Sequence, residues 1–193
     1  SGLQHSSNSC KPKVVLFLTG PTGTGKTELL KTIARILTHD ENTLVRFDMS
    51  EYGERHTDQK LFGAPPGYVG YEAGGRLTNA VRANPKAMLL FDEIEKADSS
   101  IMDKFLQILE DGRMTDGQGN TIFFADTLIF FTSNLGMEPG DIVDPVTNER
   151  YGKPQTHEDL VNRAFAGIRN KYKPEAIGRI GKDNIIVFDF ISD

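Results

Sequence analysis

Cysteine is almost missing from this sequence: Cys10 is the single one in 193 residues. One cysteine cannot form an internal disulfide or a metal site made of several thiolates, so the sequence fits a reducing compartment. The sequence also has no apolar run close to the roughly 20 residues that cross a bilayer, and no signal-peptide pattern at its start. We therefore expect a soluble, cytoplasmic protein that does not work in a membrane.

Positive charge is not in excess either. The chain has 22 Lys and Arg against 27 Asp and Glu, a net charge of -5, which gives no overall attraction for nucleic acid or an anionic membrane, although local basic patches remain possible. Internal repeats and low-complexity tracts are absent. The length predicts one domain, residues 14–193, after a tail, residues 1–13, that is disordered or partly a remnant of expression.

Apolar segments of strand length alternate with segments of helical pattern. The expected strands are Val14–Leu18, Leu44–Asp48, Ala87–Phe91, Thr127–Thr132 and Asn184–Phe190. The expected helices are Glu28–Leu37, Gly75–Ala83, Ser99–Glu110 and Thr156–Asn170. This alternation predicts an α/β fold, a five-stranded parallel sheet flanked by helices. The segment Met137–Gln155 is rich in proline and glycine without apolar period, and it predicts a long exposed loop.

Residues 20–27 spell GPTGTGKT between the first expected strand and the first expected helix. This is the full Walker A pattern, in which backbone N–H groups and a helix N-terminus face phosphate oxygens, Lys26 reaches the β and γ phosphates, and the Thr27 hydroxyl binds Mg²⁺. A glycine-rich turn that spells the motif by chance is the alternative. The pattern predicts ATP and Mg²⁺ as cofactors. The predicted binding residues of this loop are Gly20, Pro21, Thr22, Gly23, Thr24, Gly25, Lys26, Thr27 and Glu28.

Two acids, Asp92 and Glu93, follow the apolar strand Ala87–Phe91. Ligands of open α/β sheets bind at this carboxyl edge. Asp92 is therefore expected to hold Mg²⁺, and Glu93 to orient and deprotonate the attacking water. A solvated strand end is the other interpretation of such a pair.

Asn134 follows the apolar segment Leu128–Phe131. A neutral amide at the edge that carries Asp92 can hold the attacking water or contact the γ phosphate without competing for metal. The alternative is a turn-forming asparagine before Gly136, because asparagine is common in turns.

Three segments resemble one family. They are FDMSEYGERHTDQKLFGAPPGYVGYEAGGRLTNAVRANPKAMLLFDEIEKA at Phe47–Ala97, LEDGRMTDGQG at Leu109–Gly119, and TSNLG at Thr132–Gly136. They resemble the Clp family of AAA+ ring ATPases, in particular the large nucleotide-binding subdomain of the second ATPase module of ClpB and ClpA. The resemblance covers most of residues 14–180. It implies an ATPase that unfolds, disaggregates or threads polypeptides through the pore of a homo-hexamer, with unfolded or aggregated polypeptides as partners.

The same resemblance implies two further sites. In the family, GYVG faces the pore, which makes Tyr68 and Val69 the contacts for a threaded polypeptide; a proline-stiffened turn whose tyrosine packs on its own domain is the alternative. The arginine finger of the family corresponds to Arg179, within PEAIGRIG at residues 174–181; an ordinary surface arginine is the alternative. This segment departs from the family at Ala176, Gly178 and Gly181, and smaller side chains there could loosen it.

Members of the family continue into a small lid subdomain and begin with a segment that helps to hold adenine. The resemblance implies that residues 14–193 lack this lid and that the isolated fragment is a weak ATPase. A regulatory or assembly subunit that binds ATP without motor activity is the main competing function, although both acids favour hydrolysis. A nucleic-acid motor ranks last, because GAPPGYVGY has no basic residue.

Overall fold

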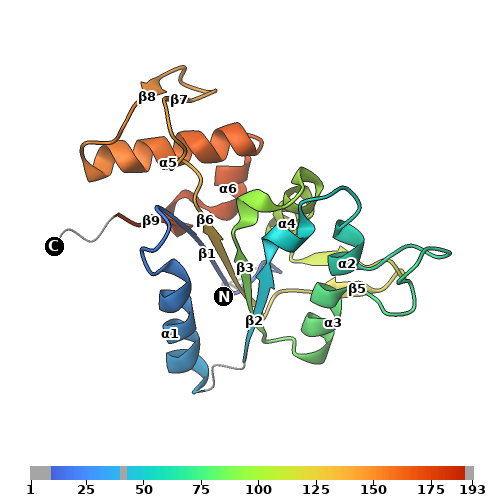
Figure 1. Ribbon diagram of the computed structural model, residues 1–193. Helices are drawn as coiled ribbons and strands as arrows, with labels where there is room; N and C mark the ends of the chain where they lie inside the picture. The colour runs from blue at the N-terminus through green and yellow to red at the C-terminus, as the bar shows by residue number, and fades with distance from the viewer. Residues whose placement is uncertain (1–9, 40–42, 190–193) are drawn as a thin grey trace, which may run out of the picture.

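A computed structural model describes residues 10–39 and 43–189. Its centre is a parallel sheet in the order β2-β3-β6-β1-β9 (Figure 1). The strands are β1 (Val14–Thr19), β2 (Leu44–Asp48), β3 (Met88–Asp92), β6 (Leu128–Ser133) and β9 (Ile185–Val187). The predicted fold class, a five-stranded parallel sheet flanked by helices, is confirmed.

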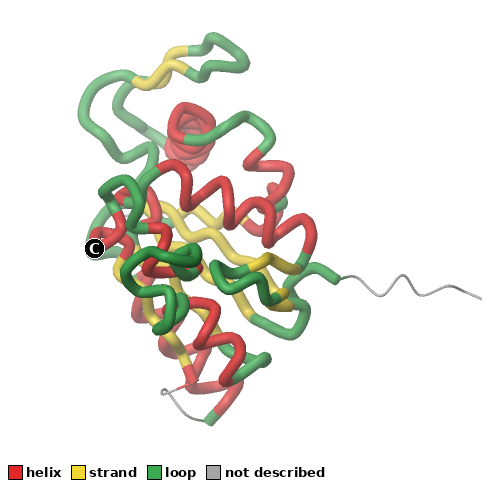
Figure 2. The backbone as a smooth tube through the Cα atoms, turned by 90° about the vertical axis from the view of Figure 1, so that its right-hand side faces the viewer, coloured by secondary structure: helices red, strands yellow, loops and turns green. Residues whose placement is uncertain are grey.

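Helices lie on both faces of this sheet, to the left and to the right of the strands in Figure 1, and Figure 2 shows the same backbone turned by 90°. They are α1 (Lys26–Thr38), α2 (Asp58–Phe62), α3 (Arg76–Ala83), α4 (Ser99–Asp111), α5 (His157–Lys171) and α6 (Ala176–Ile180). Leu30 and Ala34 of α1 pack with Leu90 on one face. The opposite face carries the larger core, which includes residues of α2 to α6. Because successive strand side chains point to opposite faces, covering both faces makes β3 apolar along its length until Asp92.

An aromatic cluster supports the strand that carries the acids. Phe91, the last apolar residue of β3, is 1% exposed and lies with its ring centroid 4.3 Å from that of Phe105 on α4. Phe47 on β2 and Phe131 on β6 stack on the ring of Phe91. Close packing holds buried side chains in single rotamers. The strand end is therefore fixed from three neighbouring elements.

Two hairpins complete the fold. One consists of β4 (Arg113–Thr115) and β5 (Thr121–Phe123), and the other of β7 (Ile142–Val143) and β8 (Arg150–Tyr151). The second hairpin corrects the prediction of a long exposed loop at residues 137–155. The guanidinium of Arg163 on α5 organises this segment by donating to carbonyl oxygens of Gly136, Glu138, Tyr151 and Gly152. Local composition does not reveal this order because the donor is outside the segment.

The residues before β1 run along the domain. The Lys13 N–H donates to the Thr127 carbonyl at 3.0 Å, and the Cys10 carbonyl lies against Gly112. Residues 1–9 of the predicted tail lie outside the described residues, as does Phe190 of the last predicted strand. Across residues 10–39 and 43–189, no helix has both the length and the apolar character that a bilayer crossing requires.

Candidate nucleotide-binding site

The loop between β1 and α1 depends on glycine. Gly23 and Gly25 have φ values of 82° and 83°, in the left-handed region that favours glycine. A Cβ atom on Gly20 would lie 2.5 Å from the Phe188 carbonyl oxygen, so a side chain does not fit there. Helix α1 begins directly after Gly25, which has no side chain to cap the first N–H groups. The loop therefore presents backbone donors and the positive end of a helix dipole, which suits an anion.

The side chain of Lys26 extends back to the backbone of this loop. Its Nζ donates to the Gly20 and Pro21 carbonyls, each at 2.8 Å, and to Asn134 Oδ1 at 3.2 Å. Burial lowers the pKa of Lys26, while the carboxylates of Glu95, Asp92 and Glu93 oppose this shift. The ammonium group is thus held between the loop and the end of β6, where phosphate oxygens could take the place of the carbonyl acceptors.

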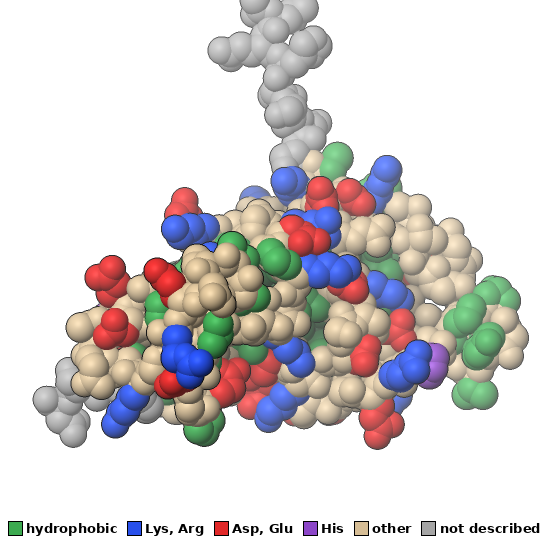
Figure 3. Space-filling model, turned by 90° about the horizontal axis from the view of Figure 1, so that it is seen from above, with side chains coloured by type: hydrophobic (Ala, Val, Ile, Leu, Met, Phe, Trp, Pro, Cys, Tyr) green, Lys and Arg blue, Asp and Glu red, His purple; other side chains and the backbone are tan. Residues whose placement is uncertain are grey.

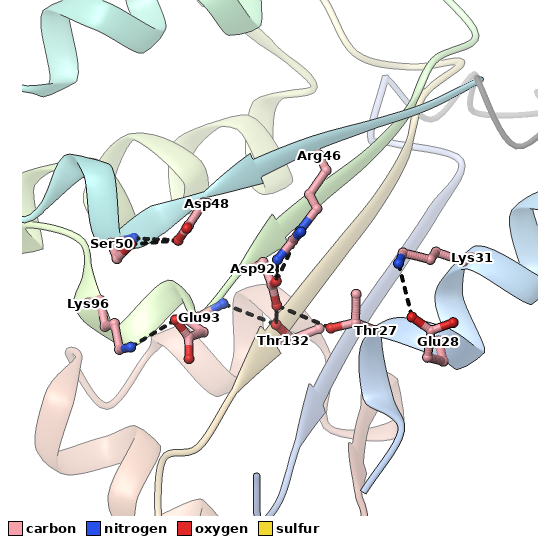
Figure 4. Close-up of polar contacts among 10 residues, drawn as sticks. All are labelled: Thr27, Glu28, Lys31, Arg46, Asp48, Ser50, Asp92, Glu93, Lys96 and Thr132. Carbon is pink, nitrogen blue, oxygen red and sulfur yellow. Dashed lines mark hydrogen bonds and ion pairs between the residues drawn. The ribbon is translucent and has the colours of Figure 1, made fainter. Parts of the chain in front are cut away.

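Asp92, at the end of β3, is buried and fully engaged by donors (Figure 4). Thr27 donates to its Oδ1 at 3.3 Å, and Thr132 donates to the same oxygen. Arg46 of β2 donates to Oδ2 through Nε at 3.1 Å and also through Nη2. The fold therefore brings the predicted metal ligands Thr27 and Asp92 within hydrogen-bonding distance, although they are far apart in sequence.

These donors fit Mg²⁺ by their chemistry. Mg²⁺ prefers oxygen ligands and is usually held by one or two carboxylates together with substrate phosphates and waters. Thr27 and Asp92 provide one hydroxyl and one carboxylate side by side. In the part of the chain that the structure describes, no group of three or more His, Cys, Asp and Glu could hold a metal by itself. One hydroxyl and one carboxylate fit a metal whose remaining ligands are phosphate oxygens and waters.

Glu93 adopts a left-handed backbone conformation with φ of 58°. Such a conformation in a non-glycine residue costs about 1–3 kcal/mol and is concentrated at functional sites. The Glu93 N–H donates to Thr132 Oγ1 at 3.0 Å, which fixes the backbone. Its carboxylate accepts from Lys96 Nζ at 2.8 Å, on the side away from Thr27 in Figure 4. Glu93 therefore has a fixed backbone and a partly exposed carboxylate.

Two adjoining cavities surround these residues. The smaller, about 220 Å³, is lined by Thr22, Lys26, Thr27, Arg46, Asp92, Glu93, Thr132, Ser133 and Asn134. The larger, about 980 Å³, shares Thr22 and Asn134 with it and extends to the residues that flank the β7–β8 hairpin and to the start of α5. The small cavity holds the groups that suit phosphate. The large cavity offers room for the remainder of a nucleotide.

Several predicted site residues do not line these cavities, among them Arg179, Tyr68, Val69 and Glu28. Arg179, on the short helix α6, forms an ion pair with Glu110, with Nε to Oε2 at 3.1 Å. Tyr68 and Val69 are 63% and 101% exposed, so most of the Tyr68 side chain faces solvent and does not pack on its own domain. Figure 3 shows hydrophobic side chains gathered at the end of the molecule where their loop projects. The side chain of Glu28, a predicted loop residue, pairs with Lys31 (Figure 4).

The sequence interpretation did not include Arg46, Thr132 and Glu95. Arg46 and Thr132 contact Asp92, and Glu95 accepts a hydrogen bond from the backbone N–H of Asn134 at 3.0 Å. A signal existed for two of them. Arg46 is a charged residue within the otherwise mainly apolar strand β2. Glu95 is the third acidic residue in the four positions that follow the apolar part of β3. Thr132 had no distinguishing signal, because threonine is common in strands.

Together, the glycine-dependent loop, the buried lysine and the acids at the sheet edge define a P-loop domain that binds nucleotides. Comparison with family models gives the particular family: the chain belongs to the AAA domain (Cdc48 subfamily) family, whose model matches residues 11–182. Membership implies nucleotide binding.

Relatives support the resemblance to ClpB that the sequence motifs predict. The chaperone protein ClpB of Meiothermus ruber is 50% identical over 173 residues, which are 90% of this chain and 19% of that protein. Heat shock protein 100 of Trypanosoma brucei brucei is 49% identical over 174 residues, again 90% of this chain and 19% of the relative. The chain thus spans about a fifth of the length of the relatives it matches.

Solved structures agree with these matches. The S. cerevisiae Hsp104:casein complex in its extended conformation is 37% identical with a TM-score of 0.78, over 94% of this chain and 30% of that chain. A closed state of Hsp104 with ATPγS and FITC casein gives 36% identity and a TM-score of 0.74, over 92% and 29% of the two chains. The fold and the family therefore agree with the sequence prediction.

Proposed function

We propose that the protein binds ATP with Mg²⁺ and hydrolyses it to unfold, disaggregate or thread polypeptides through the pore of a homo-hexameric ring. The observation that carries this proposal is the convergence of Lys26, Thr27, Asp92 and Asn134, which come from three separate segments, on one small cavity. Phosphoryl transfer depends mainly on positioning and electrostatic stabilisation, and this cluster provides both.

Each residue of the cluster has a role in this proposal. The loop N–H groups and Lys26 bind the β and γ phosphates, and Asn134 orients the attacking water. Mg²⁺, held by Thr27, Asp92 and phosphate oxygens, would neutralise charge that develops on the phosphoryl group. Glu93 takes a proton from the water after it turns from Lys96, a movement that breaks a partly exposed ion pair worth about 0–1 kcal/mol.

Two exposed features carry the motor part of the proposal. Tyr68 and Val69 provide apolar contact for a polypeptide, and burial of apolar area is indifferent to sequence. Arg179 stabilises the charge on a phosphate held by a neighbouring subunit, for which it leaves Glu110. Support comes from Hsp104, which is similar to this chain and has been solved with casein. An ATP-binding assembly or regulatory subunit without motor activity is the alternative.

A first experiment separates the two functions. Glu93→Gln and Tyr68→Ala are compared with the unsubstituted protein, expressed in the full length that its gene encodes, with and without an unfolded polypeptide. ATP turnover and the size of the oligomer by light scattering are measured. We expect Glu93→Gln to form rings and lose turnover by about 10²–10⁴-fold, the usual contribution of a general base. Tyr68→Ala should hydrolyse ATP without processing the polypeptide.

Other results would favour the alternative. Unchanged turnover in Glu93→Gln contradicts the role of this carboxylate. Rings that process polypeptide equally well with Tyr68→Ala contradict the role of the exposed loop. A protein that assembles with ATP but has no turnover even without substitution is an assembly or regulatory subunit.

A further inference from the structure

Glu95 lies beside the nucleotide cavities without lining them. It belongs to the short 3-10 helix Ile94–Lys96 that follows β3. Its Oε1 accepts from the backbone N–H of Asn134 at 3.0 Å. Asn134 is the first residue after β6, beyond the last parallel pairing of that strand with β3 at Phe91 and Phe131. The carboxylate of Glu95 therefore extends the link between β3 and β6 past the end of their ladder.

This link reaches the phosphate site through one residue. The side chain of Asn134 accepts from Lys26 Nζ at 3.2 Å, while its backbone donates to Glu95. The next residue is also held, because the Leu135 N–H donates to Ser133 Oγ at 2.9 Å. A shift of the backbone at Asn134 would move the amide relative to Lys26. The Glu95 hydrogen bond opposes such a shift.

The environment of the Glu95 carboxylate is energetically unfavourable, so stabilising the fold does not explain why this residue is a glutamate. Burial raises the pKa of Glu95. Among the described residues, its Oε2 and the Tyr172 hydroxyl are buried side-chain atoms that have no hydrogen-bond partner. Glu95 as a whole is half-buried, and a carboxyl with one buried, unpartnered oxygen destabilises the folded state relative to a well-packed apolar residue. Hydrogen bonds with the Asn134 N–H and the Ser133 side chain oppose the rise in the pKa, so the value of this carboxyl lies in holding the chain at the end of β6, the backbone of Asn134 included.

We infer that Glu95 is a positioning residue for ATP hydrolysis, which fixes the backbone of Asn134 and so sets the side-chain amide beside Lys26. Glu95 acts through Asn134 and does not contact the nucleotide. This inference rests on the proposed function, because it assigns Glu95 to the hydrolysis step rather than to binding. A positional error of about 1 Å can lower a rate by about 10²-fold, so one hydrogen bond can matter.

The test compares two substitutions of similar size in the full-length protein. Glu95→Met fills the space without an oxygen acceptor, whereas Glu95→Gln retains an amide oxygen for the Asn134 N–H. We expect Glu95→Met to lower kcat by about 10-fold or more, with KM for ATP and the affinity for a non-hydrolysable ATP analogue changed by less than about 2-fold. Glu95→Gln should restore most of kcat. Tyr172→Phe, which removes the neighbouring unpartnered hydroxyl, is the matched control and should leave kcat unchanged.

A double substitution makes the test specific. If Glu95 acts through Asn134, Glu95→Met should have little further effect in a protein that already carries Asn134→Ala. Unchanged kcat in Glu95→Met, additive effects in the double variant, or a loss of nucleotide affinity equal to the loss of kcat would each overturn the inference. Failure of the proposed function looks different, because the unsubstituted protein would then show no turnover.

Should Glu95→Met not fold, the comparison moves to Glu95→Gln and Glu95→Ala, with the melting temperature measured first. A kcat that follows the melting temperature across these variants would overturn the positioning role. A low kcat in a folded variant that lacks the acceptor supports it.

Discussion

The nucleotide edge of the sheet and the exposed loop at residues 65–74 are built in opposite ways. At the edge, Asp92 accepts from three side chains and Lys26 donates to three acceptors. In the loop, Val69 is fully exposed and the Tyr68 N–H makes a local turn bond to Pro65 at 3.2 Å. Phosphate chemistry requires fixed positions, whereas a contact for varied polypeptides requires accessible apolar side chains.

The largest expected effect is on the core beneath the nucleotide edge. Phe91→Ala should lower the free energy of unfolding by about 3–5 kcal/mol, because it removes a buried ring that contacts three other aromatic rings. Denaturant unfolding monitored by circular dichroism measures it. Phe123→Ala is the control, since that ring is 61% exposed and its loss should cost less than about 1 kcal/mol. Equal losses in the free energy of unfolding for Phe91→Ala and Phe123→Ala would contradict the conclusion that the aromatic cluster fixes this edge of the sheet.

The affinity for ATP should depend strongly on Lys26. Lys26→Ala removes a charged donor, worth about 1.5–3 kcal/mol for each hydrogen bond to a charged partner, so ATP affinity should fall by about 10–100-fold or more. Isothermal titration calorimetry measures this. Lys31→Ala on the same helix, where the side chain pairs with the exposed Glu28, is the matched control and should bind ATP normally. Similar affinities for the two variants would show that the site is elsewhere.

An intermediate effect is expected at Thr132, which accepts from the Glu93 N–H and donates to Asp92. Thr132→Val leaves the part-buried Glu93 N–H without this acceptor and removes a donor to Asp92, which should lower stability by about 1–3 kcal/mol. Thr115→Val, at an exposed strand position, should change stability by less than about 0.5 kcal/mol. Thermal unfolding of both variants gives the comparison. If both unfold at the temperature of the unsubstituted protein, the Thr132 bonds do not hold the edge.

The smallest effect belongs to the exposed loop. Val69→Ser should change the free energy of unfolding by less than about 0.5 kcal/mol, because the side chain has no buried surface to lose. ATP affinity should also stay the same. Denaturant unfolding and calorimetry check both. A loss above about 1 kcal/mol would mean that Val69 packs on the domain, and the contrast between the two regions would fail.

Local patterns predicted much of the fold. The five strands and the helices at residues 26–38, 76–83, 99–111 and 157–171 were anticipated within a few residues, because period and length are properties of short segments. The β7–β8 hairpin was not anticipated. Its order depends on Arg163, which lies in the next helix, and its Asp144 is held by Arg169 of the same helix. Both arginines lie outside residues 137–155, so the composition of that segment alone does not predict the hairpin.

The candidate site was likewise predicted only in part from the sequence. The spelling of residues 20–27 and the acids after β3 were sufficient to propose Lys26, Thr27, Asp92 and Glu93, because their chemistry is tied to fixed spacing in the chain. Short local patterns were thus enough to predict the parallel α/β fold, the family and the residue types available for phosphate and metal. The contacts of Arg46 with Asp92 and of Glu95 with Asn134 follow from the folded sheet alone, because they join strands far apart in sequence at one sheet edge.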